Sequence, residues 1–135
     1  MAIKLSEVVR NARLDAIETA IGASAVLKIR TGAPPANVAA ADSGTVLATL
    51  NLPADWMAAA SGGAKAMSGT WEDLSADNTD TAAHFRIYAS DGTTAHLQGT
   101  ITVTGGDGDM TLDTIDIVAG QTVQITSFTL TDGNA

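Results

Sequence analysis

Cysteine is absent from this sequence of 135 residues, and only five residues are aromatic. Without cysteine, the chain cannot form a disulfide framework or a thiolate metal site. With so few aromatic rings, the core must consist mainly of Val, Ile, Leu, Met and Ala, within a hydrophobic content of 45%. The length predicts one domain, which buries roughly two thirds of the surface that its unfolded chain exposes.

Long hydrophobic runs are also missing. No apolar stretch approaches the ~18 residues that a membrane-spanning helix requires. The N-terminal sequence Met1-Ala-Ile-Lys-Leu-Ser-Glu7 reaches charged residues too early for a secretory signal peptide. We therefore expect no membrane partner, and we expect the chain to be made and first folded in the cytoplasm.

Basic residues are scarce, and most of them lie near the N-terminus. The formal net charge is −8, whereas nucleic-acid-binding proteins usually present a basic face, so no nucleic-acid partner is expected. Residues 1–30 contain five of the seven basic residues and carry +2, which leaves −10 on the other residues. This split has two interpretations: it orients the protein on an acidic partner, or it is ordinary scatter of surface charge.

The sequence predicts one helix, over residues 6–21. Ser6 is the expected N-cap, Glu7 lies in the first turn where the helix dipole favours a carboxylate, and Gly22 follows as a stop. An apolar stripe along this helix comprises Leu5, Val9, Ala12, Ala16 and Ala20, widened by Val8, Ile17 and Ile21. Two hypotheses remain open: the helix packs on its own domain, or it is an arm that docks on a neighbouring subunit.

Alternating apolar and polar residues predict strands over residues 25–31, 45–52, 65–71, 110–118 and 122–132, in addition to a hairpin over 82–104. The alternation changes phase near Asp113 and Thr114, where we expect a bulge, and again at Ser127. Residues 72–80 are polar and residues 105–109 are glycine-rich, so both segments are expected to form surface loops or turns. The pattern predicts a mainly β protein: an antiparallel β-sandwich of jelly-roll type with an N-terminal α-helix. The helical segment 1–23 and the sandwich 24–135 are expected to form one folded unit.

The hairpin has its turn at Asp91-Gly92. A three-residue loop over residues 90–92 would pair Phe85 with Leu97 and place Gly92 in a left-handed conformation. The residues expected to be buried on one face are Phe85, Ile87, Leu97, Ile101 and Val103. The residues expected on the opposite face, towards solvent or another subunit, are His84, Arg86, Tyr88, His96, Gln98 and Thr100.

Candidate metal sites are incomplete in the sequence. His84 and His96 share the polar face of the hairpin, but zinc requires three or four ligands and Arg86 is expected opposite His96. The acidic loop with Asp77 and Asp80, and the turn over residues 105–109, lack the ligand spacing of a calcium loop. We therefore predict no metal and no cofactor.

Catalytic motifs are missing as well. No serine lies in a nucleophile elbow, and no glycine-rich phosphate loop joins a strand to a helix. Two histidines without any cysteine leave little capacity for acid–base chemistry at neutral pH. We predict no catalytic residues, and thus a protein that is not an enzyme.

Four segments, residues 9–22, 29–37, 84–93 and 120–131, resemble a family of small virion proteins from tailed bacteriophages and prophages. They include Ile29-Arg-Thr-Gly-Ala-Pro-Pro-Ala-Asn37 and His84-Phe-Arg-Ile-Tyr-Ala-Ser-Asp-Gly-Thr93. The resemblance covers nearly the whole chain and implies a non-enzymatic, multi-copy, homo-oligomeric component of the virion, assembled in the host cytoplasm.

Within this family, the expected role is head decoration: a cement protein that binds the assembled shell through the major capsid protein or other virion subunits. The alternative is a protein of the tail or of the head–tail junction. A different class, a carbohydrate-binding module, would require exposed aromatic residues on a flat face. Only Trp56, Trp71 and Tyr88 are available for that purpose.

Overall fold

The structure, a computed structural model, describes residues 3–135, which form one helix and eleven strands. The elements are α1 (Glu7–Ile21), β1 (Val26–Arg30), β2 (Val46–Asn51), β3 (Ala64–Ala66), β4 (Trp71–Asp73), β5 (Asp80–Thr81), β6 (His84–Tyr88), β7 (Ala95–Val103), β8 (Met110–Leu112), β9 (Asp116–Ile117), β10 (Val123–Ile125) and β11 (Thr129–Thr131). The predicted mainly β fold with one N-terminal helix is confirmed.

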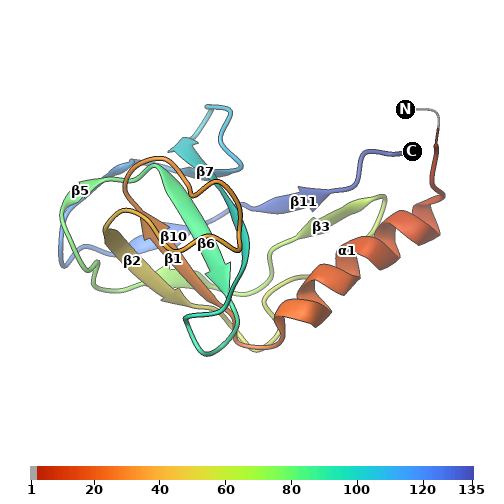
Figure 1. The fold of residues 1–135 in the computed structure, drawn as a ribbon, viewed down its shortest axis with the longest axis horizontal. Coiled ribbons are helices and arrows are strands. Elements are labelled where there is room, and N and C mark those ends of the chain that lie inside the picture. The colour runs from red at the N-terminus through yellow and green to blue at the C-terminus, as the bar shows by residue number, and fades with distance from the viewer. Residues whose placement is uncertain (1–2) are drawn as a thin grey trace.

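One five-stranded sheet, in the order β2-β1-β6-β7-β8, forms the body of the molecule (Figure 1). Its neighbours pair antiparallel except β7 and β8, which are parallel. Three two-stranded ribbons accompany it: β10–β4, β11–β3 and β5–β9. One sheet and three ribbons stand where the sequence predicted long strands, because those strands are interrupted, and the jelly-roll arrangement stays a prediction.

Each interruption falls where the backbone turns. The predicted strand over residues 65–71 divides into β3 and β4 at Gly69, whose φ is +74°. The segment 110–118 divides into β8 and β9 around Asp113 and Thr114, where a bulge was expected, and 122–132 divides into β10 and β11 around Ser127. The predicted loop 72–80 instead contributes residues to β4 and β5.

The core lies between one face of the sheet and the ribbons β4–β10 and β3–β11. A chain of aromatic contacts crosses it: Trp56 to Trp71 (5.9 Å between ring centroids), Trp71 to Phe128 (5.8 Å) and Phe128 to Phe85 (5.7 Å). Val103, predicted to be buried, is 47% exposed because it is the last residue of β7 before a surface turn.

The β6–β7 hairpin has the predicted faces but a different register. Phe85 lies opposite Gly99 and Ile87 opposite Leu97, two residues away from the predicted pairing. The loop is longer than predicted, because the N–H of Ala89 donates to the C=O of Thr94. Within the loop, the carboxylate of Asp91 accepts from the N–H groups of Thr93 and Thr94 and from the hydroxyl of Thr94.

Two glycines fix this hairpin. Gly92 has a φ of +70°, so the predicted left-handed conformation is confirmed. Gly99 provides room for the ring of Phe85, because a Cβ at this position would lie 2.8 Å from Phe85 Cε1.

Helix α1 begins and ends as predicted. Ser6 Oγ accepts from the N–H of Val9 (3.3 Å), and Gly22 donates to the C=O of Glu18 (2.9 Å). The predicted packing stripe is wrong for most of its residues, however. Ile21 is buried as predicted, together with Leu14, whereas Val8 is 78% exposed and Val9, Ala12, Ala16 and Ala20 are exposed as well. Among residues 3–135, no helix is long and apolar enough to cross a membrane.

Candidate functional site

The largest group of buried polar side chains lies on the outer face of the sheet. Strands β1 and β6 pair so that Arg30, Arg86 and Tyr88 share this face. All three converge on the carboxylate of Asp42, which comes from the long loop over residues 32–44. Asp42 pairs with Arg30 Nη2 (2.9 Å) and Arg86 Nη1 (2.8 Å), and it accepts from the hydroxyl of Tyr88 (2.8 Å). We call these four residues the Asp42 cluster.

Further hydrogen bonds hold the loop 32–44 over the sheet. Arg86 donates to the C=O of Asn37 (3.0 Å), and Gln98 Nε2 donates to the C=O of Pro35 (2.7 Å). His84 Nδ1 lies 2.7 Å from the C=O of Gly32. Because Gly32, Pro34 and Pro35 stop the chain from continuing β1 as a strand, the loop folds back across its own sheet.

The prediction that this face is exposed is therefore wrong for three of its residues. His84, Arg86 and Tyr88 are buried, while His96 and Thr100 are exposed and Gln98 is half-buried. Their polar side chains made the strands look solvent-facing in the sequence. In the structure, they are covered by a loop that supplies hydrogen-bonding partners.

Charge and burial act in opposite directions on the pKa values in this cluster. Burial alone would raise the pKa of Asp42, but the hydrogen bonds from Tyr88 and Arg86 and the charges of Arg30 and Arg86 outweigh it and lower the pKa. Burial and the bond to Asp42 raise the pKa of Tyr88. The cluster therefore holds an ionised carboxylate against two permanent cations at neutral pH.

The two histidines of the hairpin do not form a site. Arg86 faces Gln98, and His84 faces Thr100, rather than the predicted partners His96 and Gln98. His84 Nδ1 donates to the C=O of Gly32, and its buried Nε2 has no hydrogen-bond partner within residues 3–135. Burial lowers the pKa of His84 and keeps the ring neutral. Within residues 3–135, no group of three or more His, Asp or Glu side chains is arranged to hold a metal.

The acidic loops serve as connectors between elements. Asp77 accepts from the hydroxyl of Thr49 (2.9 Å), which joins this loop to β2. Asp109 accepts from the N–H of Thr100 (2.9 Å), which joins the glycine-rich turn to β7. In each case the carboxylate already bonds to a group of the same chain.

A second buried charge cluster was not predicted from the sequence. Lys65 of β3 is only 1% exposed, and its Nζ contacts Asp15 (2.6 Å) and Glu18 (3.0 Å) on α1. The bond to Asp15 and the other contacts raise the pKa of Lys65 against the opposing effect of burial. The signals in the sequence were a single lysine between two alanines at the start of a predicted strand, and two acidic residues spaced three apart on the predicted helix.

Most basic residues of the N-terminal segment are bound to their own chain. Arg30 belongs to the Asp42 cluster, Lys28 donates to the C=O of Gly92 (2.9 Å), and Arg10 donates to the C=O of Asp132 (3.3 Å). Arg13 pairs with the carboxylate of Asp132 (3.1 Å). The charge split of the sequence therefore does not produce a free basic surface for an acidic partner.

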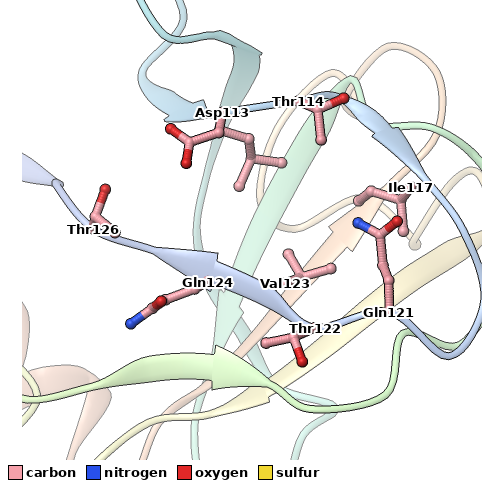
Figure 2. Close-up of a pocket in the computed structure, with 9 residues that line it drawn as sticks. Asp113, Thr114, Ile117, Gln121, Thr122, Val123, Gln124 and Thr126 are labelled. Atoms are coloured by element: carbon pink, nitrogen blue, oxygen red, sulfur yellow. The ribbon is translucent and has the colours of Figure 1, made fainter.

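A hollow of about 290 Å³ lies between residues 112–117 and 121–126. Figure 2 shows Thr114, Ile117, Gln121 and Val123 around it, with Asp113 at its upper border. The amide of Gln121 accepts from the N–H of Val118 (2.9 Å), so it is already engaged in shaping this turn. The lining offers hydroxyl and amide groups and one carboxylate, a surface suited to weak polar contacts.

Comparison with known proteins found no matching family model, no matching curated protein and no matching solved structure.

Proposed function

We propose that this protein is a non-enzymatic structural component of a tailed-bacteriophage particle, and that it decorates the assembled head as a cement protein. The resemblance of residues 9–22, 29–37, 84–93 and 120–131 to small virion proteins gives the class. The major capsid protein is the proposed partner, contacted by many copies whose weak contacts add through avidity.

The observation that carries the proposal is the orientation of α1. Its charged side faces its own protein: Asp15 and Glu18 bind Lys65, and Glu7 accepts from the N–H of Gly62 (3.0 Å). Its outward side contains the exposed residues Val8, Val9, Ala12, Ala16 and Ala20, with Arg13 (55% exposed) at the border of this stripe. A surface helix normally exposes mainly polar and charged residues. An outward apolar stripe is favourable when a neighbouring subunit covers it.

The same contacts show how the helix is presented. The carboxylates of Asp15 and Glu18 also accept from the N–H groups of Ala60 (2.9 Å) and Met57 (3.2 Å). Trp56 Nε1 donates to the C=O of Gly22 (2.9 Å) at the end of the helix. These bonds hold α1 beside β3 (Figure 1). The two hypotheses for the helix therefore concern different faces: one face packs on its own chain, and the other is proposed to dock on a neighbouring subunit.

The non-enzymatic part of the proposal is supported by how the reactive side chains are used. The buried ionisable side chains, in the Asp42 cluster and around Lys65, bind one another. These contacts hold the loop 32–44 and the helix in place. The carbohydrate-binding alternative loses its basis, because Trp56, Trp71 and Tyr88 are all fully buried. The tail or head–tail junction remains the second candidate within the virion class.

The test is incorporation into particles that lack the wild-type copy. Val8→Lys places a charge on the outward stripe, and Val118→Lys is the matched control because Val118 is 55% exposed on another part of the surface. We expect both variants to fold as the parent does, and only Val8→Lys to lose incorporation. Equal incorporation of the two variants would refute docking through α1.

The number of copies per particle distinguishes a head decoration protein from a protein of the tail or the head–tail junction. Protein counts of purified particles by mass spectrometry should give hundreds of copies for a decoration protein and about a dozen for a symmetric junction ring. Absence of the protein from purified particles would refute the virion assignment itself.

A further inference from the structure

Strand β11 forms one border of the β3–β11 ribbon, and half of its backbone N–H and C=O groups have no partner among residues 3–135. The N–H of Met67 donates to the C=O of Phe128 (2.9 Å), and the N–H of Asp132 donates to the C=O of Gly63 (2.9 Å). Because alternate residues of an antiparallel strand bond to the partner, the N–H and C=O groups of Thr129 and Thr131 point away from β3. Both threonines are exposed.

Two other strand borders, those of β3 and β2, are closed by the chain itself. On the outer side of β3, the N–H of Ala58 donates to Ala66 (2.9 Å), and Ala64 exchanges hydrogen bonds with Ser61 (2.9 and 3.1 Å). On the outer side of β2, the N–H of Thr49 donates to a carboxylate oxygen of Asp73 (2.9 Å). The part of the chain that the structure describes does not cover the β11 border in this way, and an open strand edge is a template for pairing with another strand.

We propose that a second copy of this chain pairs with β11, strand against strand, about a twofold axis at Leu130. In this register, Thr129 of one copy lies opposite Thr131 of the other. The N–H and C=O groups of both threonines, which are free in one copy, then bond to the same groups of the second copy. The spacing of two residues between the free positions makes the edge complementary to itself.

Charge and shape also favour a second copy at this edge. Each chain carries −8, yet residues 126–131 contain no charged side chain, so two copies meet here without opposing like charges. The charge next to the strand, Asp132, is neutralised by Arg13. Threonine is suited to cross-strand pairs, so the Thr129–Thr131 contacts are favourable in themselves.

Two hollows adjoin β11 and provide space for an added strand. A groove of about 570 Å³ lies between Thr131 and α1, where Ile17 lines it. A second hollow of about 310 Å³ adjoins the same strand and is lined by Leu97 and Leu130. Ile17, Leu97 and Leu130 are apolar and only partly buried in the single chain. An added strand would cover the remaining apolar surface of these residues.

This inference deepens the proposed homo-oligomerisation and rests on that part of the proposed function, not on the virion partner. Its test is the molar mass of the purified full-length protein in solution, measured by light scattering across about 10 µM to 1 mM, the range in which weak dimers dissociate. The wild-type mass should rise with concentration from 13.6 kDa towards twice that value. A mass that stays at one chain over the whole range would overturn the proposal.

Two double variants test the register. Thr129→Lys with Thr131→Lys places lysines opposite each other across the axis, so the dimer should be lost. Thr129→Lys with Thr131→Glu places a lysine opposite a glutamate twice, so the dimer should return. The side chains of both threonines are exposed, and circular dichroism should show the same fold for all variants.

The matched control is Gln124→Lys with Thr126→Lys, which adds the same charge at two exposed positions two residues apart. It should dimerise as the wild type does. A Lys/Lys variant that still dimerises, or a Lys/Glu variant that remains a monomer, would overturn the twofold pairing at β11. A monomeric Lys/Lys variant that still enters particles would leave the virion proposal intact and separate it from this one.

Discussion

Replacing Asp42 by asparagine should release the loop 32–44 from the sheet. The substitution preserves the size of the side chain, and its amide oxygen can still accept from the hydroxyl of Tyr88. It removes the negative charge that balances Arg30 and Arg86, whose side chains are only 8% and 2% exposed. Both guanidinium groups would then remain in the interior without a counter-charge.

The expected loss of stability is about 2 kcal/mol. Breaking a fully buried ion pair by removing one partner costs about 3–5 kcal/mol. The Asp42 side chain is 36% exposed, so water screens its charge and the cost is smaller than in a dry interior. For a domain of this size, a loss of about 2 kcal/mol lowers the melting temperature by roughly 6–10 °C.

The assay is urea unfolding of the parent and Asp42→Asn between pH 7 and pH 3. The pKa of Asp42 is lowered in the folded protein, so the carboxylate contributes its full stability above the unfolded pKa of about 3.9. This contribution is lost as the pH falls through the lowered folded pKa. The difference between parent and variant should therefore be constant from pH 7 to pH 5 and shrink below about pH 4.

Asp107→Asn is the control, because Asp107 is exposed in the glycine-rich turn. Its free energy of unfolding should lie within ~0.5 kcal/mol of the value for the parent, as is usual for surface substitutions. If Asp42→Asn is as stable as this control at pH 7, the Asp42 cluster does not hold the loop. If the difference does not narrow in acid, the ionised carboxylate is not its cause.

Three further measurements test the core, the turn and the buried histidine. Phe85→Ala should cost about 3–5 kcal/mol in urea unfolding, because Phe85 is fully buried against Phe128; a parent-like midpoint would contradict that packing. Gly92→Val should cost about 1–2 kcal/mol, with Gly92→Asn milder, because the nearest atom to an added Cβ is 4.0 Å away and the strain comes from the positive φ; equal stabilities would contradict the left-handed turn. The ring of His84 should titrate in NMR spectra with a midpoint below its usual value near 6.5, so that stability falls as the pH drops below 6.5 towards the lowered folded pKa; a midpoint at or above 6.5 would mean that water reaches the ring.

Local signals in the sequence were read correctly where neighbouring residues decide the outcome. The cap at Ser6 and the stop at Gly22 depend on hydrogen bonds within one turn of the helix. The left-handed turn at Gly92 and the chain breaks around Asp113 and Ser127 also depend on local backbone geometry. Strand alternation then predicted the mainly β class.

The pairing register and the lengths of the strands were harder to predict from the sequence. The β6–β7 pairing moved by two residues because Asp91 closes a longer loop and because Phe85 needs the space that Gly99 leaves. A shift of two preserves the alternation, so the hydrophobic pattern could not distinguish the two registers. The Asp42 cluster was not predicted, because sequence spacing does not show which polar residues meet across strands.

By itself, the sequence determined the helix ends, the approximate positions of the strands and which residues share a face. Only the tertiary structure decided which of those faces is covered. Polar residues on alternate positions looked exposed, yet His84, Arg86 and Tyr88 are buried because the loop 32–44 brings Asp42 over them. The apolar residues of α1 looked buried, yet Val8 faces outward because the ion pairs with Lys65 turn the charged side inward. A periodic pattern fixes the spacing of side chains along one element, whereas burial depends on partners that are distant in the chain.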